Sequence, residues 1–94
     1  MTNFWEVVIL FGIGIERVML TERAAKTFSS PELHIALFRH SNCDWGNLSA
    51  EEIKLNQRAL KGGKRVISIY NNMVVITEFG NCNVTTIAVA DEID

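Results

Sequence analysis

Apolar and β-branched residues run along the amino-terminal part of the chain from Val7 to Leu20, with breaks at Gly12 and Gly14. Such a run is typical of an extended strand with a bulge or bend between two halves. It is shorter than the roughly 20 apolar residues that a membrane-spanning helix needs. The pattern therefore predicts a buried strand rather than a membrane segment.

Three helices are expected after this strand, each with its own start signal. Thr21 is placed to cap a short helix over 22–28, with Glu22 in its positive first turn. Ser30 is expected to cap a second helix from Pro31 to about His40. Its apolar residues form broad faces that should be largely buried, and they are Leu33, Ile35, Leu37 and Phe38.

The third helix begins at a capping box, in which Ser49 and Glu52 satisfy each other's backbone N–H groups. Lys61-Gly62-Gly63 supplies a basic last turn and a left-handed stop. Between these signals lies one predicted apolar stripe, made of Ile53, Leu55, Gln57, Ala59 and Leu60.

After the glycines the apolar period changes from 3.6 to 2, which predicts strands over 64–70, 73–79 and 84–89. Asn71-Asn72 is expected to form a two-residue primed turn. That turn pairs Tyr70 with Met73, Ile69 with Val74, Ile67 with Ile76 and Arg65 with Glu78. A four-residue loop over 80–83 would then pair Glu78 with Thr85, Ile76 with Ile87 and Val74 with Val89.

Both registers place the most aliphatic residues on one sheet face, which we expect the helices to cover. That face consists of Ile67, Ile69, Val74, Ile76, Ile87 and Val89. The opposite face is also apolar, and few elements remain to cover it, so it predicts self-association. It consists of Val66, Ser68, Tyr70, Met73, Val75, Thr77, Thr86 and Ala88.

The same register places Arg65, Glu78 and Thr85 side by side across three strands. One interpretation is a structural cross-strand pair at the sheet margin, which needs no ligand. The other is a polar pocket between the sheet end and the loop 41–48. That row is the first half of a candidate binding site.

The second half of the candidate site is Arg39, His40, Asp44 and Trp45, a dense group of charged and aromatic side chains. Trp45 either caps the core between two helices or anchors a partner, because tryptophan is common at binding hot spots. His40 and Cys43 lack the paired spacing of a zinc site, so no metal or other cofactor is expected. No catalytic residues are assigned, since the named catalytic motifs are absent.

Composition and length narrow the class of protein. The 94 residues hold 48% hydrophobic residues and one proline, which fits a single domain over 1–94 and excludes a disordered or multidomain chain. The net charge of −2 makes nucleic-acid binding an unfavourable interpretation. With two cysteines and no basic n-region, the expected location is the cytoplasm, with no membrane attachment.

A series of short motifs resembles a family of small bacterial proteins carried on plasmids and other mobile elements. These proteins are usually labelled plasmid-related and sometimes type I restriction subunit M. The resemblance covers about Phe11 to Val89, although the hairpin after Tyr70 is shorter and the family's acidic-aromatic ending is missing. The motifs are Arg39-His40, Asp44-Trp45-Gly46, Asn56 with Ala59-Leu60, Arg65 with Ser68 and Tyr70, Ile76-Thr77-Glu78 and Val84-Thr85-Thr86-Ile87.

What the resemblance implies is accessory cargo of a mobile element, without a mechanism. The restriction label does not carry over, because a chain of this length cannot hold a methyltransferase domain. We expect a non-enzymatic binding protein that forms a homodimer and contacts a host protein, thereby modulating a host system. The alternative is a small-molecule binder or minor enzyme that uses the candidate site.

The expected architecture is α+β: an N-terminal strand, two to three helices, and then a three-stranded antiparallel meander, with the helices packed on one sheet face.

Overall fold

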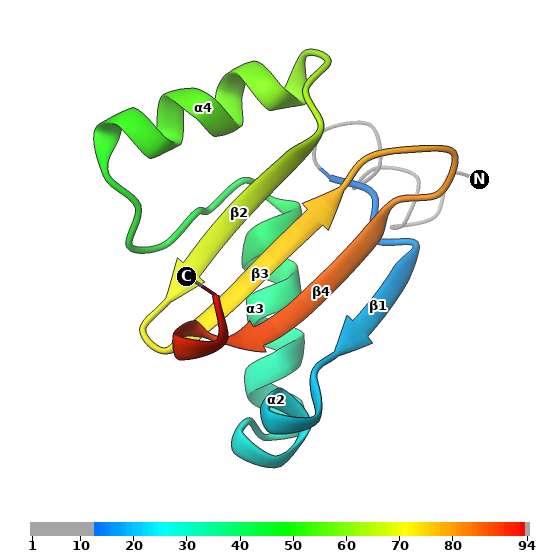
Figure 1. Ribbon diagram of the computed structural model, residues 1–94, viewed down its shortest axis with the longest axis vertical. Coiled ribbons are helices and arrows are strands. Elements are labelled where there is room, and N and C mark those ends of the chain that lie inside the picture. Colours follow the sequence, from blue (N-terminus) through cyan, green and yellow to red (C-terminus); the bar gives the residue numbers. More distant parts are fainter. Residues whose placement is uncertain (1–12, 94) are drawn as a thin grey trace, which may run out of the picture.

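The computed structural model describes residues 13–93, and these form an α+β fold (Figure 1). One strand and three helices precede a three-stranded antiparallel meander, so the predicted fold class is confirmed. The elements are β1 (Arg17–Leu20), α2 (Glu22–Thr27), α3 (Ser30–Ser41), α4 (Ala50–Leu60), β2 (Arg65–Tyr70), β3 (Met73–Glu78), β4 (Val84–Val89) and the 3₁₀ turn η1 (Ala90–Glu92).

The strands form one mixed sheet in the order β1-β4-β3-β2. β1 runs parallel to β4, and the other neighbours are antiparallel. The predicted first strand is too long, because within the described residues only Arg17–Leu20 is strand; its part from Val7 to Gly12 lies outside them. Residues 13–16 form a loop, in which Ile13 donates its N–H to the carbonyl of Ser41 at 2.9 Å.

The helices begin at polar caps, as the sequence indicates. Thr21 accepts from the N–H of Ala24, and Ser49 forms the predicted capping box with Glu52. For α3 the predicted cap is wrong by one residue: Ser29 is the N-cap, with Glu32 completing a second capping box. Ser30 is the first residue of the helix, and Pro31 occupies the second position, where its missing N–H costs nothing.

The predicted register between β2 and β3 is confirmed. Tyr70 faces Met73, and Arg65 faces Glu78 at the other end of the hairpin. Asn71 has a positive φ of 58°, as a primed two-residue turn requires at its first central position. The turn alone thus sets which side chains of these two strands share a face.

The predicted register between β3 and β4 is wrong by one residue. Glu78 faces Val84 instead of Thr85, because the connecting loop begins at Phe79 and not at Gly80. Phe79 donates its N–H to the carbonyl of Lys64, beside β2, and its ring packs in the core. The remaining pairs shift with it: Ile76 faces Thr86, Val74 faces Ala88 and Met73 faces Val89.

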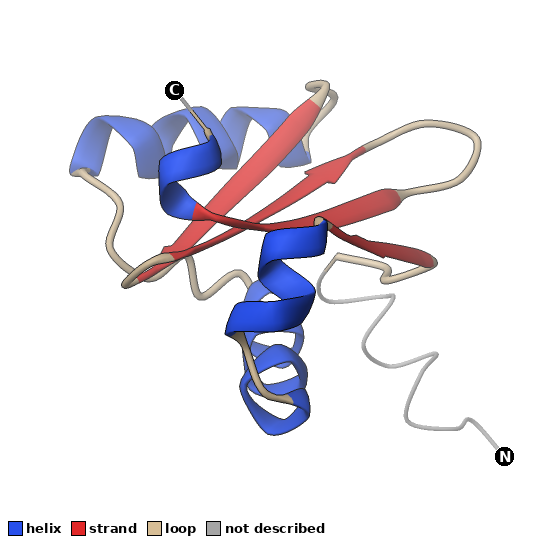
Figure 2. Cartoon of the chain, turned by 60° about the horizontal axis from the view of Figure 1, so that its bottom comes forward, coloured by secondary structure: helices blue, strands red, loops and turns tan. Residues whose placement is uncertain are grey.

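On β2 and β3 the sheet face buried under the helices is the reverse of the predicted one, whereas Ile87 and Val89 of β4 are buried there as predicted. Figure 2 shows α2 and α3 together on one side of the sheet. The side chains on that side are buried, and they are Val66, Ser68, Tyr70, Met73, Val75, Thr77, Thr85, Ile87 and Val89. Six of the eight residues predicted for self-association, all except Thr86 and Ala88, therefore lie on this buried face within a single chain. This corrects the predicted surface, and self-association itself stays a prediction. The prediction chose the more aliphatic face, whereas the covered face contains hydroxyl groups that the structure satisfies internally.

The core has two parts. Ala24, Phe28 and Ala36 pack from the helices against β3 and β4, and a second cluster gathers around Ile13, Trp45 and Val66. Other apolar side chains of the helices are exposed, because α3 turns only one narrow side to the sheet and α4 lies at its edge; for Ile35 and Phe38 this corrects the prediction that they are largely buried. The exposed side chains are Ile35 (61% exposed), Phe38 (58%), Leu55 (60%) and Leu60 (42%).

No helix in residues 13–93 has the length and apolar character to cross a membrane.

Candidate functional site

A chain of polar side chains runs through the core beneath the sheet. His40, at the carboxyl end of α3, is fully buried, and its Nδ1 lies 2.6 Å from Oγ of Ser68 on β2. Its Nε2 lies 2.8 Å from Oγ1 of Thr77 on β3. The chain continues from Thr77 to Oγ1 of Thr85 on β4 at 2.7 Å. One helix and three strands are thus joined through four buried side chains.

Burial keeps the His40 ring neutral. Desolvation lowers the pKa of His40 from 6.5 to about 4, because the charged imidazolium would lose its hydration inside the core. The ring meets Trp45 edge to face, with the centroids 5.8 Å apart and the planes at 76°. Trp45 is itself buried, so the structure places it as a cap on the core rather than as an exposed anchor.

The Ser68–His40 pair resembles part of a nucleophilic dyad, but its surroundings do not suit catalysis. A nucleophile must reach a substrate atom, and both Ser68 and His40 have 0% of their surface exposed. The second ring nitrogen faces a threonine instead of the carboxylate that orients the histidine in a triad. The pair therefore acts as an internal structural link in this fold.

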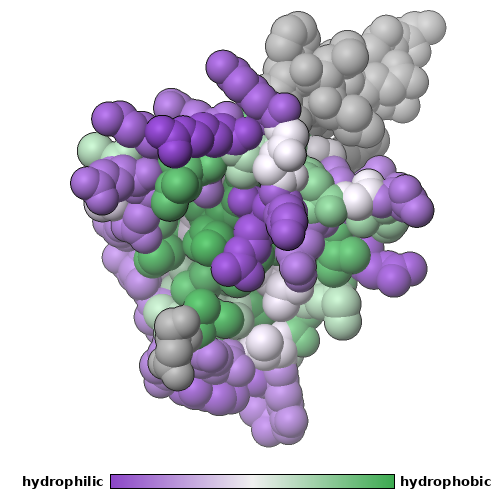
Figure 3. Space-filling view, turned by 45° about the horizontal axis from the view of Figure 1, so that its top comes forward, coloured by the Kyte–Doolittle hydropathy of each residue, from purple (hydrophilic) through white to green (hydrophobic). Residues whose placement is uncertain are grey.

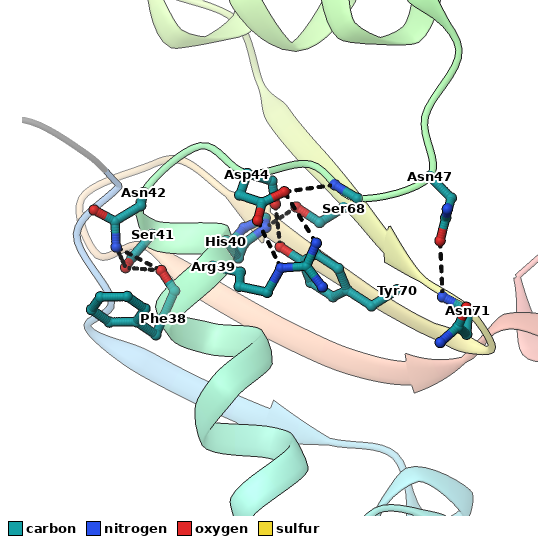
Figure 4. Close-up of polar contacts among 11 residues, drawn as sticks. Phe38, Arg39, His40, Ser41, Asn42, Asp44, Asn47, Ser68, Tyr70 and Asn71 are labelled. Atoms are coloured by element: carbon teal, nitrogen blue, oxygen red, sulfur yellow. Dashed lines mark hydrogen bonds and ion pairs between the residues drawn. The ribbon is translucent and has the colours of Figure 1, made fainter.

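The charged half of the predicted cluster lies on the surface beside this chain (Figure 4). Arg39 donates from Nε to Oδ2 of Asp44 at 2.7 Å, and its guanidinium lies over the Tyr70 ring, 4.4 Å from the centroid. Tyr70 donates its hydroxyl to the backbone carbonyl of Asp44. The hydrogen bond from Arg39 lowers the pKa of Asp44, and burial raises the pKa of Tyr70. Each polar group here is directed to another residue of the same chain.

This arrangement fixes the loop 42–49 along the outer edge of β2. Ile69 donates its N–H to the carbonyl of Trp45 at 3.0 Å, and Asn47 donates its N–H to the carbonyl of Ile69 at 2.7 Å. Asn56 of α4 bonds both backbone groups of Ile67, as donor at 2.7 Å and as acceptor at 3.1 Å. The loop and α4 together occupy the outward hydrogen-bonding groups of Ile67 and Ile69 on this edge strand.

The predicted row of Arg65, Glu78 and Thr85 does not exist. Arg65 and Glu78 are opposite each other and exposed, and they are not among the ion pairs of the described residues. Thr85 lies on the other sheet face and is buried, because the shift in the β4 register moves it across the sheet. The predicted position of the Asp44-Trp45 loop over the row is also wrong, since that loop borders β2 at Ile69.

Four residues of this region belong to the motifs of the resemblance but were not predicted as site residues: Ser68, Thr77, Tyr70 and Asn56. A signal for the first two was present, since Ser68, Thr77 and Thr85 each place a small hydroxyl group within an otherwise apolar strand. Asn56 interrupts the apolar stripe of α4 at a position that faces the sheet, and it is buried. Polar residues at such positions indicate an internal partner.

Residues 13–93 contain no group of three or more His, Cys, Asp or Glu side chains that could hold a metal ion. A cleft of about 220 Å³ lies between α4 and β2, where Leu55 and Asn56 face Arg65 and Ile67. It opens on the sheet face opposite to α2 and α3. Of the predicted site residues, it contains Arg65 alone.

Comparisons with protein-family models, with curated proteins and with solved structures gave no match.

Proposed function

We propose that this chain is a non-enzymatic binding protein that acts through a protein partner. The observation that carries the proposal is the sheet face left uncovered by α2 and α3. In that face one row of neighbouring residues crosses all four strands, and we name it the open row: Ile67, Ile76, Thr86 and Met19. Its members are partly or largely exposed.

Charged side chains border the open row on one side. On the same sheet face, two positions further along each strand, lie Arg65, Glu78, Val84 and Arg17, which are again neighbours across the sheet. Among the described residues neither arginine has an ion-pair partner. On the other side of the open row this sheet face is not accessible to a partner, since Val74 and Ala88 are buried.

Figure 3 gives a view of this surface, in which apolar side chains gather beneath a band of hydrophilic ones. Leu55 of α4 extends the apolar area across the cleft to Ile67 and is 60% exposed. An apolar area with a polar border is typical of a protein interface. The partner that fits presents apolar side chains next to a carboxylate, which would meet Arg65 or Arg17.

Further support comes from the groups that catalysis would need. His40 and Ser68 are buried, and Asp44 and Arg39 are paired with each other. The resemblance to mobile-element proteins adds the proposal that the partner belongs to the bacterial host, as expected for cargo that modulates a host system. The expected cytoplasmic location is part of the same proposal.

The test is capture of a partner by tagged full-length protein from a bacterial lysate, with matched variants. Leu55→Lys and Arg65→Glu should each abolish capture of the same protein, because both alter the uncovered face. Ile35→Lys is the control: Ile35 is 61% exposed on α3, on the other side of the sheet, and this change should leave capture intact. Capture that survives both test variants would contradict the proposal.

A small-molecule binder is the second candidate, favoured by the cleft between α4 and β2 and its Arg65. A thermal melt against a metabolite collection separates the two functions, because a bound ligand stabilises only the folded protein. Stabilisation that is lost in Arg65→Glu, with no captured protein, would favour the small-molecule function.

A further inference from the structure

The two edges of the sheet differ in how their backbone groups are paired. At β2 the outward groups of Ile67 and Ile69 are bonded by Asn56 and by the 45–47 loop. β1 is the other edge, where Figure 1 shows no described element on its outer side. Edge strands are normally shielded, since free N–H and C=O groups bind other strands.

The backbone groups of β1 that point outward belong to Val18 and Leu20. Arg17 donates its N–H to the carbonyl of Asn83 at 3.2 Å, and Thr21 donates to the carbonyl of Ile87 at 3.0 Å. Alternate residues of a strand direct their N–H and C=O groups to the same side. The even-numbered residues therefore point away from β4, and among the described residues nothing bonds them.

From Val18 to Leu20 the side chains of β1 are apolar on both sheet faces. Val18 is 41% exposed, Met19 53% and Leu20 41%. Natural edge strands are commonly protected by charges, prolines or bulges, and β1 has none of these between Val18 and Leu20. An exposed apolar edge strand without these protections is typical of a strand that pairs with another strand.

We propose that the free edge of β1 pairs antiparallel with β1 of a second copy of this chain, centred on Met19. Val18 of one copy then faces Leu20 of the other, and their outward N–H and C=O groups bond each other. Met19 meets Met19 on the opposite face. Arg17 faces the uncharged Thr21, so the pairing avoids contact between like charges.

The alternative register centred on Val18 is less favourable. It would place Glu16 opposite Leu20 and Arg17 opposite Met19, and so would replace apolar pairs with mixed ones. A register shifted by a single residue would align outward groups with inward ones, and it would break the hydrogen bonds. The sequence of β1 thus matches itself best about Met19.

This dimer uses residues other than those on α4 and β2, yet it bears on the proposed function because Met19 ends the open row. Two copies joined at β1 would place their open rows end to end across one continuous sheet. A small domain also gains buried surface from such pairing. The dimer therefore offers one extended surface to a partner.

The test is sedimentation of the full-length protein at micromolar concentration. The unaltered chain should be a dimer, and Met19→Lys and Met19→Glu should each weaken dimerisation at least about tenfold, because like charges then face each other at the axis. An equimolar mixture of the two variants should restore the dimer. Only a pairing of Met19 with Met19 predicts this rescue.

Two further variants keep the outcome clear. Val18→Pro removes an outward N–H while leaving the bonds to β4, so it should give a monomer with an unchanged circular dichroism spectrum. Leu55→Lys, which tests the proposed function, should remain a dimer. A monomeric unaltered chain, or a Met19→Lys variant that still dimerises, overturns the inference and leaves partner capture through α4 and β2 to be judged separately.

Discussion

Asn56 serves Ile67 as a neighbouring strand would: its side-chain amide donates to the carbonyl at 2.7 Å and accepts from the N–H at 3.1 Å. The amide is the one side-chain group that offers a donor and an acceptor in the spacing of a peptide unit. By this contact α4 is fixed beside β2, and the cleft with Arg65 takes its shape from it.

Replacing Asn56 should loosen that edge. Asn56→Ala removes both bonds and leaves the two backbone groups of Ile67 without partners, so we expect a loss of about 1–3 kcal/mol in the free energy of unfolding. Urea denaturation measures this loss. Gln57→Ala, at the exposed neighbouring position, is the matched control and should change stability by less than about 0.5 kcal/mol. Equal effects at the two positions would contradict the role given to Asn56.

The buried His40 should make stability depend on pH. Its pKa is about 4 in the folded chain and 6.5 when exposed, so below pH 6.5 the unfolded state binds the proton first. The stabilisation from keeping His40 neutral is complete above about pH 6.5 and declines as the pH falls towards 4. The expected loss over that range is roughly 3 kcal/mol.

Denaturation at a series of pH values, with His40→Gln for comparison, tests this dependence. The carboxyl groups with lowered pKa values, such as Asp44 and Glu52, lose their contributions only nearer pH 4 and below. Decline between pH 6.5 and 5 therefore reports His40, and it should be absent from the variant. If the ring of His40 titrates near 6.5 in an NMR experiment on the folded protein, the interpretation is wrong.

Gly46 should tolerate no side chain. It has a φ of +73°, and a Cβ built there would lie 2.0 Å from the carbonyl oxygen of Ile69, where the loop meets β2. Gly46→Ala should cost about 3 kcal/mol or more, through strain and the loss of that contact. Gly62 is the control, because it also has a positive φ but faces open space, so Gly62→Ala should cost only about 1 kcal/mol. Thermal melts of both variants decide the matter.

Substitutions can test whether the N-cap of α3 is Ser29, as in the structure, or Ser30, as predicted from the sequence. Ser29→Ala should lower stability by about 1 kcal/mol, since the side chain of Ser29 accepts from the N–H of Glu32. Ser30→Ala, one position later, should be nearly neutral. If Ser30→Ala lowers the stability in urea denaturation more than Ser29→Ala does, Ser30 is the N-cap and the assignment to Ser29 is wrong.

Sequence reasoning succeeded where a local signal decided the structure. The capping box of Ser49 and Glu52 and the turn at Asn71 involve residues a few positions apart, and both were predicted in place. The loop after Glu78 was not, because its length depends on Phe79, whose N–H bonds Lys64 and whose ring packs in the core. Neither contact has a local sequence signal.

The predicted grouping of the candidate-site residues was only partly correct, again because local sequence signals determine only contacts between residues close in sequence. Arg39 and Asp44 are close in sequence, and the structure pairs them. The links from His40 to Ser68 and Thr77 join positions 28 and 37 residues apart, so they depend on the three-dimensional packing of α3 under the sheet. The predicted buried face was wrong on β2 and β3 for the same reason, since hydrophobicity alone does not show that the hydroxyl groups of Ser68 and Thr77 bond the His40 ring.

The parallel pairing of β1 with β4 has a consequence for the order of assembly during synthesis. Arg17 of β1 pairs with Val84 of β4, so β1 has no neighbouring strand until β4 has been synthesised. When the chain has emerged from the ribosome only as far as Glu78, all three helices and the β2–β3 hairpin can form, while Val18, Met19 and Leu20 have no neighbouring strand. Because contacts between distant segments form late and slowly, β1 is the segment most exposed to other chains, and to chaperones, until β4 emerges.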